Sequence, residues 1–179
     1  MSALNFLKIT DRKDERLSFV KALYQSAFPI QERREWPVLL SMISPGAEMQ
    51  LDLVTDQEQP VAFVIWWKIS DWLFIEHLAV SSAERGKNYG SRIMHHYLDA
   101  AQGNMLLEVE PPLSEEAQRR ISFYERLGLH LLEYMYEQPS YRVKGVVYPM
   151  RLMSTCKELS DRPTFDDLVE QIKAKVYFI

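Results

Sequence analysis

The chain has 179 residues, 47% hydrophobic and 26% charged, a balance typical of a globular protein and unlike that of a disordered or fibrous one. Its 21 basic and 25 acidic residues give a formal charge of −4, so no general positive field is available and we expect no nucleic-acid partner. The single cysteine, Cys156, excludes an internal disulfide and a cysteine-rich zinc site. No apolar run approaches the ~20 residues of a transmembrane helix, and the charged residues 1–20 do not fit a secretory signal. We therefore expect a cytoplasmic protein with no membrane partner.

Apolar periodicity, turn residues and helix caps predict strands and helices along the whole chain. The predicted strands cover residues 4–10, 48–55, 60–69, 72–80, 105–110, 129–137 and 146–153. The predicted helices cover residues 14–28, 36–43, 90–102, 114–127 and 165–175. Thr164 is expected to cap the last helix, whose apolar face predicts either packing on its own sheet or a dimer contact. The order β-α-α-β-β-β-α-β-α-β-β-α predicts an α/β (α+β) layer sandwich, with an antiparallel meander over residues 48–80.

The loop after the strand at 72–80 combines positive charge with small residues at the start of a helix. Its sequence is Arg85-Gly86-Lys87-Asn88-Tyr89-Gly90-Ser91. Residues that are small or tolerate a left-handed backbone let N–H groups converge, and the following helix N-terminus adds about half a positive charge. Such a loop can bind a pyrophosphate without a metal ion. Neither a G-x-G-x-x-G nor a P-loop motif is present, and by itself the loop is equally well interpreted as a plain connection.

Two further segments add to this loop and together resemble one family. Arg85-Gly86-Lys87-Asn88-Tyr89-Gly90 resembles the Q/R-x-x-G-x-G/A acyl-CoA motif of the GNAT superfamily of N-acyltransferases, and it follows a Leu-Ala-Val strand end as in that family. The segment Phe123-Tyr124-Glu125-Arg126-Leu127-Gly128-Leu129 is similar to the second signature of the family, and Leu107-Glu108-Val109 is similar to its fifth strand. The resemblance covers residues 61–153 and implies a mostly antiparallel central sheet of about seven strands flanked by helices. We expect an acyltransferase domain over residues 1–153 and a C-terminal helical extension over residues 154–179, packed on the same domain.

The resemblance also implies how acetyl-CoA, as co-substrate and without a metal ion, would bind. In the family the fourth strand splays from the fifth, and the pantetheine arm pairs with the freed backbone, which places the thioester near a main-chain amide, here that of Leu78. The implied cofactor-binding residues are Leu78, Ala79, Val80, Arg85, Gly86, Lys87, Asn88, Tyr89, Gly90 and Ser91. Asn88 departs from the motif, because the first motif glycine is usual at its position. Asparagine tolerates a positive φ best after glycine, so we expect the turn to form.

Three residues are candidates for proton transfer. Tyr124 stands where the family has a tyrosine near the cofactor sulfur. A phenol with a pKa near ~10 is protonated at pH 7 and can give its proton to a leaving thiolate. The alternative for Tyr124 is packing as a core aromatic. Glu76 shares a strand face with apolar side chains, which predicts a general base, a water-facing edge residue or an ion pair. Glu108 occupies the Leu-Glu-Val position that supplies the base in some family members, and structural pairing with a basic neighbour is its alternative. His77 is expected to be a hydrogen-bonded strand histidine.

The function implied by the resemblance is N-acetyl transfer from acetyl-CoA to a primary amine of a small molecule, peptide or protein, by direct attack in a ternary complex. The alternative is a non-catalytic regulatory module that has the same fold and binds coenzyme A without turnover of any acceptor. Residues 30–45 and 138–145 are expected to shape the acceptor pocket. The sequence leaves open the identity of the acceptor and the choice between monomer and homodimer.

Overall fold

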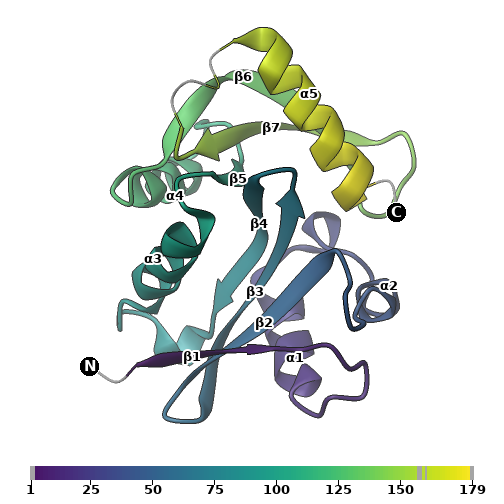
Figure 1. Ribbon diagram of the computed structural model, residues 1–179, viewed down its shortest axis with the longest axis vertical. Helices are drawn as coiled ribbons and strands as arrows, with labels where there is room; N and C mark the ends of the chain where they lie inside the picture. The colour runs from purple at the N-terminus through teal and green to yellow at the C-terminus, as the bar shows by residue number, and fades with distance from the viewer. Residues whose placement is uncertain (1–2, 157–158, 160, 178–179) are drawn as a thin grey trace. The chain divides into compact units, whose positions relative to one another are not determined.

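Seven strands form one mixed sheet in the computed structural model, which describes residues 3–156, 159 and 161–177 (Figure 1). Hydrogen bonds connect them in the order β1-β2-β3-β4-β5-β7-β6. The strands are β1 Leu4–Lys8, β2 Met49–Asp56, β3 Gln59–Ile69, β4 Trp72–Val80, β5 Met105–Val109, β6 His130–Pro139 and β7 Val147–Ser154. Strand β4 runs parallel to β5, whereas the β1–β2, β2–β3, β5–β7 and β6–β7 pairs are antiparallel. The predicted fold class and the predicted order of elements are confirmed.

The α-helices of the described residues follow the predicted amphipathic segments. They are α1 Leu17–Ala27, α2 Trp36–Ser41, α3 Tyr89–Ala101, α4 Glu115–Glu125 and α5 Arg162–Ile172. Short 3₁₀ turns, η1 Ile30–Glu32 and η2 Ser82–Glu84, precede α2 and α3, and a π-helical turn, η3 Lys173–Tyr177, continues α5. None of these helices is both long and apolar enough to cross a membrane.

Helix α5 begins three residues earlier than the sequence predicted. The cap is Asp161, whose side chain accepts a hydrogen bond from the Thr164 backbone N–H at 3.0 Å, so the expected cap at Thr164 is wrong. Pro163 explains the error, because a proline fits the first helical turn, where its missing N–H needs no partner. Helix α4 instead begins as expected, with Ser114 accepting from the Ala117 N–H at 3.1 Å.

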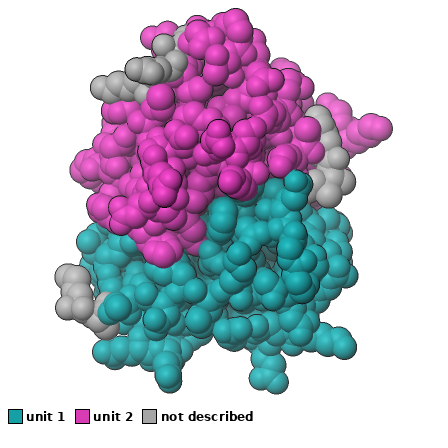
Figure 2. Space-filling view, viewed as in Figure 1, with its two compact units in different colours: residues 1–67, 76–93 teal, residues 68–75, 94–179 magenta. Residues whose placement is uncertain are grey.

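The described chain forms two compact units, coloured in Figure 2. The first comprises residues 1–67 and 76–93, with a core that includes Val20, Leu53 and Phe63, all fully buried. The second comprises residues 68–75 and 94–179, with a core that includes Leu106 and Phe165. The domain boundary expected after residue 153 stays a prediction.

Strand β4 continues beyond its pairing with β5. The parallel register covers Leu73 to Ile75, whereas the strand runs on to Val80. The Glu76 residue is half-buried although its side chain has 0% exposure, so the exposed surface of this residue belongs to its backbone. The last five residues of β4 therefore include a backbone edge that a further extended chain could pair with.

Helix α5 and η3 cover one face of the β6–β7 end of the sheet (Figure 1). The Phe165 ring of α5 lies 5.2 Å from the Tyr134 ring of β6, and the buried residues Leu168, Val169 and Ile172 follow at helical spacing. This apolar stripe accounts for the position of α5, and it favours packing on its own sheet, the first of the two predicted alternatives.

Candidate functional site

The loop between β4 and α3 has the backbone conformation of an anion cradle. Gly86 has a φ of 81° and Asn88 a φ of 62°, both in the left-handed region, and α3 begins at Tyr89. The positive φ expected at Asn88 is confirmed. A Cβ added at Gly86 would meet no atom within 4 Å, so the backbone of the loop is accessible from solvent. These features fit a pyrophosphate, because they present backbone N–H groups and a helix N-terminus to an open surface.

The side chains of this loop divide into exposed cations and one buried anchor. Arg85 and Lys87 are exposed, and Lys87 is 2.8 Å from a carboxylate oxygen of Glu84. Tyr89 is buried, and its hydroxyl donates to Asp56 Oδ2 on β2 at 2.6 Å. We infer that the Tyr89 side chain fastens the start of α3 to the sheet, so a cofactor contact at this position would come from its backbone.

Replacing Asn88 with alanine should destabilise the protein by about 1 kcal/mol, because alanine is penalised in the left-handed region and Asn88 is exposed, with no packing to lose. At this chain length the melting temperature should fall by roughly 2–4 °C. The Asn88→Gly variant is the matched control and should melt close to the unmodified protein. Equal melting temperatures for the alanine and glycine variants would show that this turn does not depend on the left-handed residue.

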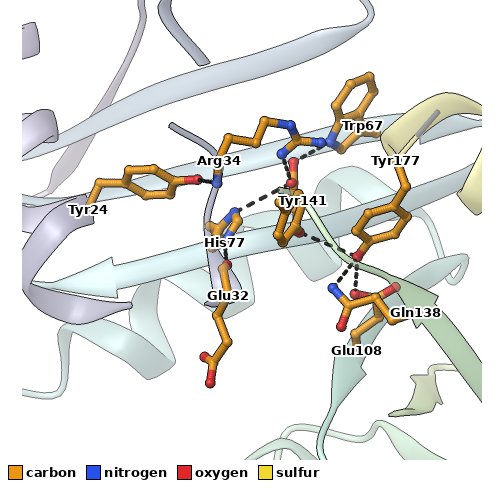
Figure 3. A network of polar contacts seen from close by, with 10 residues as sticks. Tyr24, Glu32, Arg34, Trp67, His77, Glu108, Gln138, Tyr141 and Tyr177 are labelled. Carbon is orange, nitrogen blue, oxygen red and sulfur yellow. Dashed lines mark hydrogen bonds and ion pairs between the residues drawn. The ribbon is translucent and has the colours of Figure 1, made fainter. Parts of the chain in front are cut away.

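Glu76 lies in a buried ion pair with Arg34, whose side chain is labelled in Figure 3. Its carboxylate accepts a hydrogen bond from Arg34 Nη1 and one of 2.7 Å from Trp67 Nε1, and the Arg34 side chain is 5% exposed. Burial raises the pKa of Glu76, but the charges of Arg34 and His77 and the two hydrogen bonds outweigh it and leave the pKa below its ordinary value. The arrangement corresponds to the ion-pair alternative among the three that the sequence left open.

His77 and Tyr24 extend the same buried group. His77 Nε2 donates to the Glu32 carbonyl oxygen at 3.0 Å, as expected for a hydrogen-bonded strand histidine, and burial lowers its pKa despite the nearby Glu76 carboxylate. The Tyr24 hydroxyl accepts from the Arg34 backbone N–H at 2.9 Å, and its ring packs edge-on against His77 at 5.1 Å. These contacts attach the segment between α1 and α2 to β4.

Glu108 contacts a tyrosine from the C-terminal end of the described chain (Figure 3). The Tyr177 hydroxyl donates to Glu108 Oε2 at 2.5 Å, and Gln138 Nε2 donates to the Tyr177 oxygen at 2.8 Å. The Tyr141 hydroxyl is 3.4 Å from that of Tyr177. The nearby Glu110, by contrast, is engaged by Arg120 in a partly exposed ion pair.

Tyr124 lies near the C-terminal end of α4, where Gly128 has a φ of 90° and ends the helix as predicted. The residue is partly exposed, and burial of its hydroxyl raises its pKa above the ordinary value while the charge of Arg120 opposes the increase. A raised pKa keeps the phenol protonated at neutral pH, the state that a proton donor needs.

Sequence reasoning found the carboxylates but not the residues that hold them. Arg34 and Trp67 are 42 and 9 positions from Glu76, and Tyr177 is 69 positions from Glu108, so no local pattern connects them. Among the described residues, no three histidine, cysteine, aspartate or glutamate side chains are placed to share a metal ion.

Comparison with solved structures gives a consistent set of relatives. A Bacteroides thetaiotaomicron protein provisionally described as a GNAT-family acetyltransferase aligns over 98% of this chain and 99% of its own, with 28% identity and a TM-score of 0.89. The ribosomal-protein-S18-alanine N-acetyltransferase of Escherichia coli aligns over 86% and 92%, with 19% identity and a TM-score of 0.59. Arabidopsis thaliana Naa50, in complex with the bisubstrate analogue CoA-Ac-MVNAL, aligns over 85% and 96%, with 20% identity and a TM-score of 0.57. At these identities the last two show likeness of fold only.

The family assignment rests on the sequence as well as on the fold. No curated protein matches the chain significantly. Residues 17–129, more than half of the chain, match the model of the Acetyltransferase (GNAT) family, and this range includes the cradle, Glu108 and Tyr124. The chain therefore belongs to the GNAT acetyltransferase family.

Proposed function

We propose that this protein is an acetyl-CoA-dependent N-acetyltransferase that acetylates a primary amine of a small molecule, peptide or protein by direct attack in a ternary complex. The cradle at residues 85–91 carries the proposal, because its open backbone and two left-handed residues are suited to a pyrophosphate. The fold and family support the same activity. The bound analogue of Naa50 supports acetyl-CoA as the donor.

Two parts of the chain would bind the donor. Backbone groups of Gly86, Asn88 and the first turn of α3 would hold the pyrophosphate, with Arg85 and Lys87 adding charge beside it. The β4 backbone from Leu78 to Val80 would pair with the pantetheine arm, since the pairing of β4 with β5 stops at Ile75. The Leu78 amide would then stabilise the negative charge that develops on the thioester oxygen. Ala79 is buried and would contribute only main-chain atoms.

The reaction requires removal of two protons from the ammonium nitrogen and delivery of one proton to the sulfur. An amine with a pKa near ~10.4 is mostly protonated at pH 7, which costs about 4.6 kcal/mol before the nitrogen can attack. Glu108 would accept one proton from the ammonium group and pass it to solvent, and the neutral nitrogen would bond to the acetyl carbon. The bond between that carbon and sulfur would then break while the nitrogen gives its second proton to Glu108. Tyr124 would give its proton to the departing thiolate. An amide and coenzyme A result, and Tyr124 regains its proton from solvent.

Glu108 is favoured over Glu76 as the base because of their partners. The Glu76 side chain is fully buried and paired with the Arg34 cation, so its negative charge is already neutralised and its pKa is lowered, which makes it a weak proton acceptor. The Tyr177 hydroxyl that donates to Glu108 is neutral, so this hydrogen bond does not itself cancel the negative charge of the carboxylate. We therefore assign Glu76 the role of a buried counter-ion for Arg34.

The direct test is incubation with acetyl-CoA and a broad panel of primary amines and peptides, following release of free thiol. Turnover that depends on the amine, with an N-acetylated product seen by mass spectrometry, is expected. Stabilisation by coenzyme A without turnover of any acceptor would favour the non-catalytic module. Absence of both turnover and stabilisation would overturn the proposal in either form.

Replacing Arg85 with alanine should weaken coenzyme A binding by roughly 3–10-fold, since one exposed positive charge beside a phosphate contributes about a kcal/mol. The loss should shrink at high salt, where exposed charges are screened. Titration calorimetry at low and high salt measures both effects. The Lys21→Ala variant removes the same charge from the exposed face of α1 and should bind coenzyme A like the unmodified protein. Equal losses of affinity in the two variants would mean that binding depends on the net charge alone and not on the position of Arg85.

A further inference from the structure

The C-terminal segment provides a side chain to the carboxylate that we assign as the base. Residues 162–177 lie outside the range that matches the family model, yet Tyr177 reaches Glu108 of β5. The strand register explains this contact. Glu108 is opposite Leu152 of β7, and Tyr136 of β6 is opposite Met150, which is two residues from Leu152 on the same strand. Side chains two residues apart point to the same side of a sheet, so Glu108 and Tyr136 share the face on which α5 and η3 pack.

The π-helical turn fixes where Tyr177 points. Val176, the preceding residue, is 1% exposed and continues the buried stripe of α5. The helix end is also tied to the β3–β4 turn, because Ser70 Oγ donates to Gln171 Oε1 at 2.6 Å. The buried Val176 and the bond from Ser70 thus hold the π-helical turn and the helix before it. The Tyr177 ring packs against the Tyr141 ring with centroids 5.0 Å apart. Single π turns in helices occur frequently at functional sites.

The hydrogen bonds around the Tyr177 hydroxyl have a definite direction. Gln138 donates its Nε2 proton to the hydroxyl oxygen, and the hydroxyl donates its own proton to Glu108 Oε2 (Figure 3). A hydroxyl has one proton, so accepting from Gln138 leaves that proton for the carboxylate. The chain from Gln138 through Tyr177 to Glu108 therefore stabilises the ionised carboxylate and fixes the plane in which its two oxygens lie.

We propose that Tyr177 is a positioning residue that orients the Glu108 carboxylate to accept the proton of the attacking amine. This inference rests on the proposed function, in which Glu108 is the base. A carboxylate has about four lone-pair sites, so the bond from Tyr177 orients it without using up its capacity to accept a proton. Tyr177 itself transfers no proton to or from the substrate.

The Tyr177→Phe variant tests this inference, because it keeps the ring against Tyr141 and removes only the hydroxyl. We expect kcat to fall about tenfold, since a misoriented base loses part of its advantage, while KM for acetyl-CoA stays within about twofold. In a Glu108→Gln background the same change should have almost no further effect on kcat. This lack of additivity distinguishes positioning of Glu108 from a general loss of packing.

Tyr134→Phe is the matched control. It removes a hydroxyl from the sheet face on which α5 packs, while the ring stays against Phe165, so kcat should stay unchanged.

A second readout needs no turnover. In urea unfolding, the effects of Tyr177→Phe and Glu108→Gln on the transition midpoint should also be non-additive. Wild-type turnover with an unaffected Tyr177→Phe variant, or additive losses, would overturn the inference alone. Absence of wild-type turnover would overturn the proposed function and, with it, the positioning role.

Discussion

Replacing Tyr124 with phenylalanine should lower kcat by about 10²–10⁴-fold, the usual contribution of a positioned proton donor. The thiolate of coenzyme A would then leave without a proton from the enzyme. KM for acetyl-CoA should change little, because the ring and its packing against Phe123, with centroids 5.1 Å apart, are retained. Steady-state kinetics with the best amine of the panel measure both quantities.

The pH profile adds a second check on Tyr124. Burial raises its pKa above the ordinary value of 10.0, so the phenol stays protonated through neutral and mildly alkaline pH. We therefore expect no loss of kcat from this group up to about pH 9, while rising pH deprotonates the amine and favours attack. A variant with full kcat, or a loss confined to KM, would contradict the proton-donor role, and an unchanged melting temperature would exclude misfolding as the cause.

Breaking the buried ion pair should have the largest effect on stability. Glu76→Gln and Arg34→Met should each lower the free energy of unfolding by about 3–5 kcal/mol, because each leaves one buried group without its charged partner. The melting temperature should fall by roughly 10 °C. The double variant should lose less than the sum, since neither charge remains. As a matched control, the exposed pair of Glu115 and Arg119, 2.8 Å apart on α4, should contribute less than about 1 kcal/mol.

The contribution of the Glu76 carboxylate to the free energy of unfolding should depend on pH in one direction. Its pKa in the folded protein lies below the ordinary 4.5, so the stability it provides is fully present above that value and is lost as the pH falls through the folded pKa. The difference in unfolding free energy between the wild type and Glu76→Gln should thus be constant near neutral pH and shrink below about pH 4.5. Urea unfolding across this range measures it, and a difference that grows on acidification would show that Glu76 is protonated in the native state.

Local features of the sequence predicted much of the fold. The strand from Trp72 to Val80 was predicted to the residue, because alternating apolar side chains and flanking turn residues define it. The left-handed conformation at Asn88 followed from the small energetic cost that asparagine has there. Helix ends were predicted less well, as α5 shows, because an aspartate and a threonine three positions apart are both plausible caps.

The candidate site could be predicted only in part, because its chemistry depends on contacts between distant residues. The sequence identified Glu76, Glu108 and Tyr124 as candidates, and their roles stay predictions. Each carboxylate has a partner far away in the sequence: Arg34 is paired with Glu76, and the Tyr177 hydroxyl donates to Glu108. Neither Arg34 nor Tyr177 belongs to a motif, so the tertiary structure was needed to find them.

The position of Tyr177 bears on how enzymes of this kind could diverge. With the roles proposed above, residues that bind the donor lie within the family-matched range. Tyr177, which donates to the Glu108 carboxylate, lies after it, as do Gln138 and Tyr141, which contact the Tyr177 hydroxyl. Substitutions in that later stretch could alter acceptor preference without disturbing the thioester end of the reaction. Exchanging residues 138–177 between related chains would then transfer the preference for an acceptor, and this preference could be inherited with one segment of the chain.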